Sequence, residues 1–159
     1  MYVRLKSLRA NLDNTILTLC GAALVLLVIT VTWQVFSRYV LNDPSSWTDE
    51  LSRYTMVWLG LLGASYLFGI KAHLAITLLA HSIPPKINHV LQIFINMVIL
   101  TFVILAMFRG GLTLAGRAMT QLTPALQIPM GYVYYILPIS AVIITIYIIL
   151  NVLDSFFEE

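Results

Sequence analysis

The residues of this chain best suited to chemistry lie between two long apolar runs. Two arginines and two adjacent carboxylates fall in one short stretch there: Arg38, Asp49, Glu50 and Arg53. Ionisable groups close to hydrocarbon are costly unless they are paired or hydrated, so this group needs a physical reason. Three explanations are open: catalysis by the carboxylates, ion pairing between two helices, and docking of a partner protein.

Catalysis is the weakest explanation, since no nucleophile or metal ligand accompanies the carboxylates. Asn42–Pro44 is typical of a turn, and the residues after it are typical of a helix start with a capping side chain. Asp49 and Glu50 then lie in the first helical turn and Arg38 in the last turn of the preceding helix, where the helix dipoles favour their charges. A short connection makes the two helices antiparallel neighbours, so Arg38 is predicted to reach Asp49 or Glu50. Arg53 is predicted to pair with either carboxylate at helical spacing.

Three histidines, His73, His81 and His89, raise the hypothesis of a metal or haem site. A haem in a helix bundle needs ligands that project into its interior from facing helices. These histidines instead fall at the predicted membrane interface, and Pro84–Pro85 separates the last from the others. Solvated interfacial histidines are the favoured interpretation. Cys20 stands alone, which excludes an internal disulfide and a cysteine metal cluster, and no cofactor is predicted.

The composition is that of an integral membrane protein. Hydrophobic residues make up 60% of the chain and charged residues 10%, and the mean hydropathy is +0.91. Soluble domains contain about 45–50% apolar and about 25% charged residues. A net charge of +2 gives no reason to expect nucleic acid as a partner. The first apolar run extends from Ile16 to Tyr39, well beyond the roughly 7–15 residues of a signal peptide's apolar core, so a retained anchor is expected.

Four apolar stretches are long enough to cross a membrane, because about 20 helical residues span about 30 Å of hydrocarbon. They cover about residues 14–41, 47–70, 86–119 and 131–152. Polar and apolar residues mix over 71–85, which predicts a short amphipathic helix at the membrane surface. The expected fold is an all-α integral membrane protein with a single membrane domain over residues 1–159. It has four transmembrane helices, plus the interfacial amphipathic helix between the second and third.

Lysine and arginine are unevenly divided between the two sides of this arrangement, and cytoplasmic loops carry the excess in membrane proteins. One side receives Arg4, Lys6, Arg9, Lys71 and Lys86. The other side receives Arg38 and Arg117, with Arg53 and Arg109 deeper in their helices. The excess predicts that both termini are cytoplasmic.

Polar residues recur at four-residue spacing towards each end of the third stretch: Asn88, Gln92 and Asn96, then Arg109, Thr113 and Arg117. Its middle is nearly all apolar, so a contact with a neighbouring helix is predicted rather than a substrate path. Small residues also recur at intervals that let helices approach closely: Gly60 and Ala64, Ser65 and Gly69, Ala106 and Gly110, Gly111 and Ala115. A transporter that acts alone places polar groups near the bilayer midplane, and this sequence places none there.

Several motifs together resemble the small membrane subunit, DctQ-like, of the tripartite ATP-independent periplasmic (TRAP) transporters. The matching stretches are Phe36–Asn42, Trp47–Tyr54, Val57–Gly60, Leu62–Ala64, Thr123–Leu126 and Ile128–Pro129, with Tyr134 and Pro138. His73 matches the histidine that follows the family's second helix. Ala72 and Thr77 stand where the family often has glycine and an acidic residue, so a role tied to that acid is not carried over.

The resemblance implies a non-catalytic scaffold subunit in a bacterial inner membrane. Its implied partners are the lipid bilayer, a large membrane subunit that holds the substrate and sodium sites, and a periplasmic solute-binding protein. The implied solute is an organic acid anion, of the sialic-acid type or dicarboxylate-like. Residues expected to contact partners or hold the structure are Arg38, Trp47, Asp49, Glu50, Arg53 and His73.

Two other functions remain open from the sequence. A self-sufficient small four-helix exporter would need a membrane-embedded carboxylate, and the first helix has none between Thr15 and Val40. A membrane anchor subunit of a redox enzyme would bind haem or quinone, for which an absorption spectrum is the direct test.

Overall fold

A computed structural model describes the backbone of residues 2–70 and 85–157 and the side chains of residues 7–70 and 94–152. The amphipathic helix predicted over 71–85 lies almost entirely outside the described residues. His73 and His81 lie outside them as well. Within the described ranges the chain is helical apart from its connections and one isolated β-bridge, so the all-α expectation is confirmed there.

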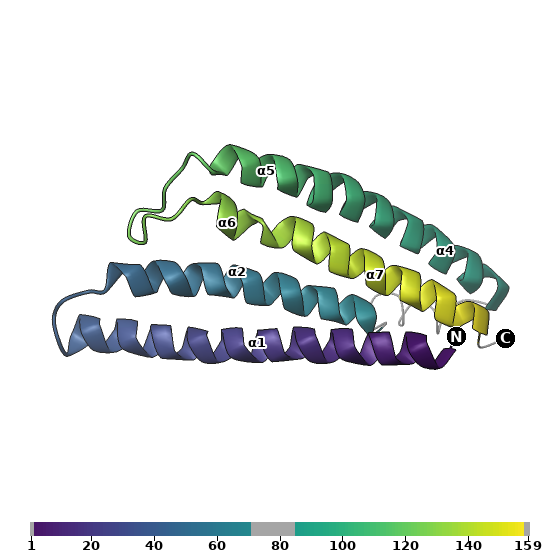
Figure 1. The fold of residues 1–159 in the computed structure, drawn as a ribbon, viewed down its shortest axis with the longest axis horizontal. Helices are drawn as coiled ribbons and strands as arrows, with labels where there is room; N and C mark the ends of the chain where they lie inside the picture. Colours follow the sequence, from purple (N-terminus) through teal and green to yellow (C-terminus); the bar gives the residue numbers. More distant parts are fainter. Residues whose placement is uncertain (1, 71–84, 158–159) are drawn as a thin grey trace.

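Four long helical segments make up the described part of the chain (Figure 1). The first two are α1 (Tyr2–Tyr39) and α2 (Ser46–Gly69). The third runs without interruption through α4 (Pro85–Phe102), the π-helix η1 (Val103–Gly110) and α5 (Gly111–Ala118). The fourth consists of α6 (Gly131–Tyr134) and α7 (Ile136–Phe157).

These helix bounds follow the apolar stretches closely except at the two ends of the chain, where α1 begins earlier and α7 ends at Phe157, about five residues later than predicted. The second and third segments begin and end within one residue of the stretches 47–70 and 86–119. Helix α1 begins at Tyr2 rather than near residue 14. Hydropathy marks only the part of a helix that is apolar, whereas the preceding residues include leucine, lysine, arginine and alanine, which favour helix in water too. The fourth segment breaks before α7, whose first turn contains Pro138, where a missing N–H costs little.

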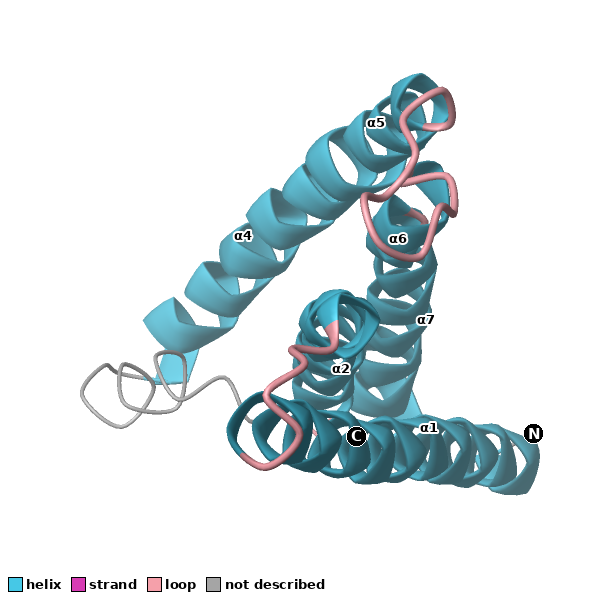
Figure 2. Cartoon of the chain, turned by 90° about the vertical axis from the view of Figure 1, so that its left-hand side faces the viewer, coloured by secondary structure: helices cyan, strands magenta, loops and turns pink. Residues whose placement is uncertain are grey.

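The segments form two helical hairpins that pack side by side. Helix α1 runs antiparallel to α2, and α2 also packs against α7, which in turn packs against η1. Figure 2 shows α1 and α5 at opposite edges, with α2 and α6–α7 between them. The beginning of α1 and the end of α7 lie at the same end of the molecule (Figure 1). We call this the terminal end and the opposite end the loop end.

Among the residues that the structure describes, three helical stretches are long and apolar enough to span a membrane: Ser7–Tyr39, Phe94–Ala118 and Gly131–Val152. Helix α2 has 24 residues but is less apolar. Its position explains the difference, because it packs on both sides against protein and buries polar side chains there. These are Thr48, Glu50, Ser52, Thr55 and Ser65. The faces of α2 that contact α1 and α7 do not need the apolar surface that lipid requires, whereas its remaining face is exposed and includes Met56, Val57 and Leu67.

Two apolar clusters hold the bundle together. One joins α1, α2 and α7 through Ile16, Leu62, Ile136 and Tyr147. The other joins η1 to α7 through Val103, Ala141, Ile144 and Ile148. Because both clusters include α7, this helix links the two hairpins.

Glycines set how closely the segments approach. A Cβ at Gly131 would lie 2.6 Å from the carbonyl oxygen of Ala115, and one at Gly111 would lie 2.9 Å from Pro138 Cδ. At Gly69 a Cβ would overlap the ring of Tyr147. Two of the predicted small-residue pairs, Ser65 with Gly69 and Gly111 with Ala115, are therefore buried in helix contacts. The pairs Gly60 with Ala64 and Ala106 with Gly110 lie on exposed or open surfaces and make no such contact within the described chain.

Candidate functional site

The loop end is built from the connection between α1 and α2 and the longer connection between α5 and α6. The first is closed by Ser37, whose carbonyl accepts the Asp43 N–H (3.1 Å) and whose Oγ accepts the Ser45 N–H (3.3 Å). Asn42 takes a left-handed backbone conformation (φ 53°), which asparagine tolerates well. Ser45 precedes the first residue of α2. No side chain caps a backbone N–H there, and the Thr48 hydroxyl donates instead to Ser45 Oγ (2.8 Å).

Asp49 connects the two helices of the first hairpin. Its Oδ1 accepts a hydrogen bond from Gln34 Nε2 of α1 (2.8 Å), and its Oδ2 pairs with Arg53 Nη2 one turn along α2 (2.9 Å). The ion pair with Arg53 therefore has the predicted spacing. Arg38 is exposed and forms no ion pair with either carboxylate in the described chain, so the predicted pairing is wrong. The register of the hairpin is the reason, because it sets Gln34, one turn before Arg38, level with Asp49.

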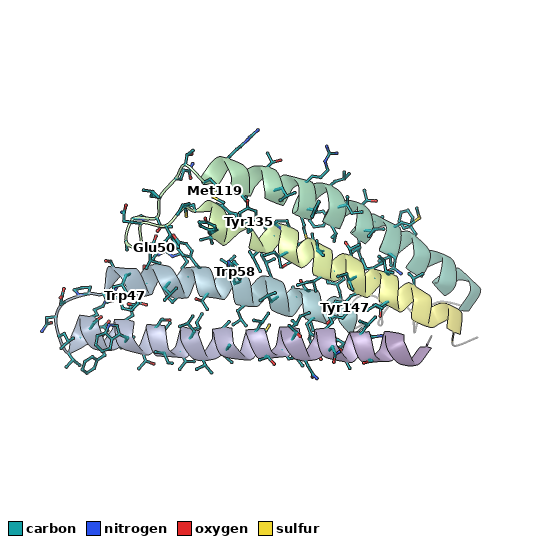
Figure 3. All side chains as sticks on the ribbon, viewed as in Figure 1. Trp47, Glu50, Trp58, Met119, Tyr135 and Tyr147 are labelled. Carbon is teal, nitrogen blue, oxygen red and sulfur yellow. The ribbon has the colours of Figure 1, made fainter. Side chains whose placement is uncertain are left out.

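Glu50 makes a different connection from the one predicted. Its side chain is buried, with 7% exposure, and points away from α1 towards the α5–α6 connection (Figure 3). One carboxylate oxygen accepts the Tyr54 hydroxyl (2.7 Å). The other accepts the backbone N–H groups of Ala125 and Leu126, both at 2.8 Å. Glu50 thus ties the first hairpin to the second, across 75 residues of sequence.

The α5–α6 connection has the geometry that receives this carboxylate. Leu122 and Pro129 form an antiparallel β-bridge, and the Met130 N–H donates to the Gln121 carbonyl (2.8 Å). Thr123, fully buried, exchanges hydrogen bonds with Ile128 through its backbone N–H (2.9 Å) and its hydroxyl (3.1 Å). The tip between them turns with two successive N–H groups free to face one anion, which is a common anion-binding arrangement of backbone. Here the anion is supplied by the chain itself.

Two aromatic side chains of α2 also contact the second hairpin near Glu50. Trp58 Nε1 donates to the Val133 carbonyl in α6 (3.1 Å), and the Tyr54 hydroxyl also lies 3.5 Å from the Met130 sulfur. Trp47, at the start of α2, is 47% exposed at the molecular surface (Figure 3). We call the set Asp49, Glu50, Tyr54 and Trp58, with the loop tip Ala125–Leu126, the loop-end joint.

A second polar group at the terminal end was not anticipated from the sequence. The Tyr147 hydroxyl of α7 donates to Asp13 Oδ1 of α1 (2.5 Å), across 134 residues. The amide of Asn151 donates to the Phe68 carbonyl of α2 (3.0 Å), and the Arg9 guanidinium donates to the Gly69 carbonyl. These bonds join α1, α2 and α7. The available signal was Asp13 itself, a lone acid directly before an apolar run, together with a tyrosine and an asparagine in an otherwise apolar last helix.

The polar groups at the two ends of the bundle hold the structure together and are not arranged for catalysis. The carboxylates of Asp49 and Glu50 already accept hydrogen bonds from protein donors on both oxygens. A general base must lie within hydrogen-bond reach of a substrate proton, whereas both oxygens of each carboxylate are engaged here with donors that hold the helices and the connection together. In the described ranges no three histidine, cysteine, aspartate or glutamate side chains gather as metal ligands would.

Comparison with known proteins gives the family. The family model described as "Tripartite ATP-independent periplasmic transporters, DctQ component" matches residues 27–158. The chain is 27% identical over 153 residues to a putative TRAP transporter small permease protein of Haemophilus influenzae, covering 96% of this chain and 94% of that one.

Two further relatives carry substrate names of their own. The sialic acid TRAP transporter small permease protein SiaQ of Vibrio cholerae is 26% identical over 140 residues, covering 88% of this chain and 80% of SiaQ. The isethionate TRAP transporter permease protein DctMQ of Oleidesulfovibrio alaskensis is 23% identical over 141 residues, covering 84% of this chain but only 22% of DctMQ. The family model and the first of these relatives match most of the chain, and this match assigns the chain to a family. The chain belongs to the DctQ family, the small, non-catalytic membrane permease components of TRAP transporters.

Proposed function

We propose that this chain is the scaffold subunit of a sodium-coupled TRAP importer in a bacterial inner membrane. In this proposal it forms a single membrane domain over residues 1–159, crosses the bilayer four times and keeps both termini in the cytoplasm. A large membrane subunit carries the solute and sodium sites, and a periplasmic binding protein delivers the solute. The solute is an organic acid anion.

The observation that carries the proposal is the internal use of the polar side chains. Glu50 and Asp49 bind donors of this chain, and the buried hydroxyls of the helices, Ser140 excepted, are also hydrogen-bonded within it. Thr30, Thr55 and Ser65, for example, donate to carbonyls one turn earlier on their own helices. Groups that are already satisfied hold a structure rigid, whereas a solute site needs polar groups that become satisfied only when the solute binds.

The names of the relatives support the finer parts of the proposal. DctMQ is a single permease chain in which this chain's counterpart makes up about a fifth of the length, which favours a small subunit that stays in contact with a larger one. Sialic acid and isethionate are both organic acid anions, and this supports a solute of that class.

Reconstitution into proteoliposomes tests the proposal. This chain, the large subunit and the binding protein are tested singly and together, with an inward sodium gradient and radiolabelled sialic acid or a dicarboxylate. Solute uptake is expected only with all three proteins and sodium. Uptake by this chain alone would contradict the proposal and favour a self-sufficient transporter.

A further inference from the structure

Two arginines lie on the outer surface of the third helical segment. Arg109 is in the last turn of η1 and Arg117 is in the last turn of α5, and both are exposed. The exposed Thr113 lies between them at helical spacing. No described side chain pairs with either guanidinium. The helix contact predicted for these residues is therefore not made within the described chain.

This strip points away from the rest of the bundle. The face of α5 that packs against α6 and α7 is formed by Gly111, Ala115 and Ala118, all buried. Arg109, Thr113 and Arg117 are all exposed, so they lie outside this packed face. Exposed apolar side chains flank the arginines: Phe108, Leu112 and Leu114. We call Arg109, Thr113 and Arg117 the basic strip.

The depth of Arg109 makes its exposure costly. It lies nine residues before Ala118, where the apolar span Phe94–Ala118 ends, which is about 13 Å along the axis at 1.5 Å per residue. Side chains in a helix lean towards its N-terminus. If the end of this apolar span marks the membrane surface, Arg117 lies at that surface and Arg109 leans away from it. A charge held in hydrocarbon requires a partner or water.

Arg53 provides an internal comparison. It lies seven residues after Ser46, the first residue of α2, and it leans towards that end of the helix. It is nevertheless paired with Asp49 at 2.9 Å. Arg109 lies nine residues from the nearer end of its apolar span, leans away from that end and has no acidic residue on its own helical segment. It is also held in a π-helix, a rare conformation that often accompanies functional sites.

We propose that the basic strip is the docking surface for the large permease subunit, which presents an acidic side chain to Arg109 within the membrane. This inference rests on the proposed function, because it requires that such a subunit exists. The charge of the strip calls for an anionic partner, and its apolar flanks call for a partner helix. A lipid phosphate lies at headgroup level, where it meets Arg117 but not the deeper Arg109.

Co-purification measures the contact directly. A tag on this chain recovers the large subunit from membranes that contain both, and the recovered ratio is compared among variants. Arg109→Gln is expected to lower recovery on the order of tenfold, since one lost ion pair of about 1.4 kcal/mol is a tenfold change in affinity. Arg109→Lys keeps the positive charge and is expected to retain part of the recovery of the large subunit. Asp43→Asn, which changes the charge of an exposed side chain outside the strip, is the control and is expected to leave recovery of the large subunit unchanged.

Cysteine cross-linking locates the contact independently. In a Cys20→Ala background, Thr113→Cys is expected to cross-link to the large subunit. Thr18→Cys, exposed on α1, is expected not to do so. Equal melting temperatures of the isolated Arg109→Gln and unmodified chains would show that the variant folds.

The outcomes separate this inference from the proposed function. If the unmodified chain recovers no large subunit, the proposed function fails and the inference fails with it. If it recovers the subunit and Arg109→Gln recovers it equally well, the inference alone is overturned. The unmodified chain could instead retain phospholipid that Arg109→Gln loses, while both recover the large subunit equally well. That result would assign the strip to lipid binding and would also overturn the inference. Rescue of Arg109→Glu by an acid-to-arginine change in the large subunit would support it most directly.

Discussion

Adjacent acids in this chain serve different neighbours. Successive residues of an α-helix project about 100° apart, so Asp49 and Glu50 cannot face the same partner. Asp49 faces Gln34 on α1, whereas Glu50 faces the loop tip and binds two backbone N–H groups there. Glu50 is the more demanding of the two because it is buried, and a buried carboxylate is tolerated only when it is hydrogen-bonded.

Replacing Glu50 by alanine is expected to release the tip of the α5–α6 connection. Two partly buried N–H groups would lose their acceptor, which costs about 2 kcal/mol of stability. Hydrogen exchange at Ala125 and Leu126 should accelerate, and the melting temperature in detergent should fall. Glu50→Gln, which keeps one acceptor oxygen, should give a smaller change.

Asp43→Asn is the matched control, because it removes one acidic charge from the exposed α1–α2 connection. In the assembled transporter, Glu50→Ala should weaken subunit assembly or docking of the solute-binding protein more than it changes the competition between solutes for uptake. A changed solute preference with assembly intact would contradict a purely structural role for Glu50.

At the scale of helical elements, close packing against the fourth segment depends on a few positions. Helix α5 lies so close to α6 that Gly131 meets backbone oxygen as well as the Met119 sulfur, at 2.6 and 2.7 Å from a Cβ built there. A backbone contact cannot be relieved by a change of rotamer. Gly116, by contrast, has no atom within 4 Å of such a Cβ, since it lies on the exposed face of α5.

This difference makes two glycine-to-alanine changes a matched pair. Gly131→Ala is expected to push α5 and α6 apart and to destabilise the protein by about 1–3 kcal/mol, the usual cost of overpacking. Gly116→Ala should leave stability unchanged or raise it, because alanine favours helix by up to about 1 kcal/mol. Thermal unfolding of both variants in the same detergent is the measurement. An equal effect of the two changes would mean that the contact of Gly131 with α5 does not hold these helices together.

At the scale of the whole molecule, two hairpins are fastened at both ends. The loop-end joint connects α2 to the α5–α6 connection, and the Tyr147–Asp13 bond connects α7 to α1 at the terminal end. The start of α1 and the end of α7 lie at the same end of the bundle (Figure 1). An even number of crossings follows if all four segments span the membrane.

Reporter fusions test this topology. Because the excess of lysine and arginine lies on the side of the termini, green fluorescent protein fused after Glu159 is expected to fluoresce. Alkaline phosphatase at the same position is expected to be inactive, and alkaline phosphatase inserted at Asn42 is expected to be active. Active phosphatase at the C-terminus would overturn the proposed orientation.

The sequence by itself determined the class of the protein and most of its helices. Hydropathy and charge are local properties, so they mark the second and third segments within one residue of their ends. Several motifs together, from Phe36–Asn42 to Pro138, indicated the family, which the family model confirms. The helical spacing of Asp49 and Arg53 was also readable, since both lie on one helix.

Only the tertiary structure decided which groups meet across the bundle. Glu50 binds a loop 75 residues away, and Gln34 rather than Arg38 meets Asp49. The rotation of each helix and the register of each hairpin fix these contacts, and they depend on how all the side chains pack together. Local periodicity carries no information about that packing, so the chain's charged cluster could be located from its sequence but its partners could not.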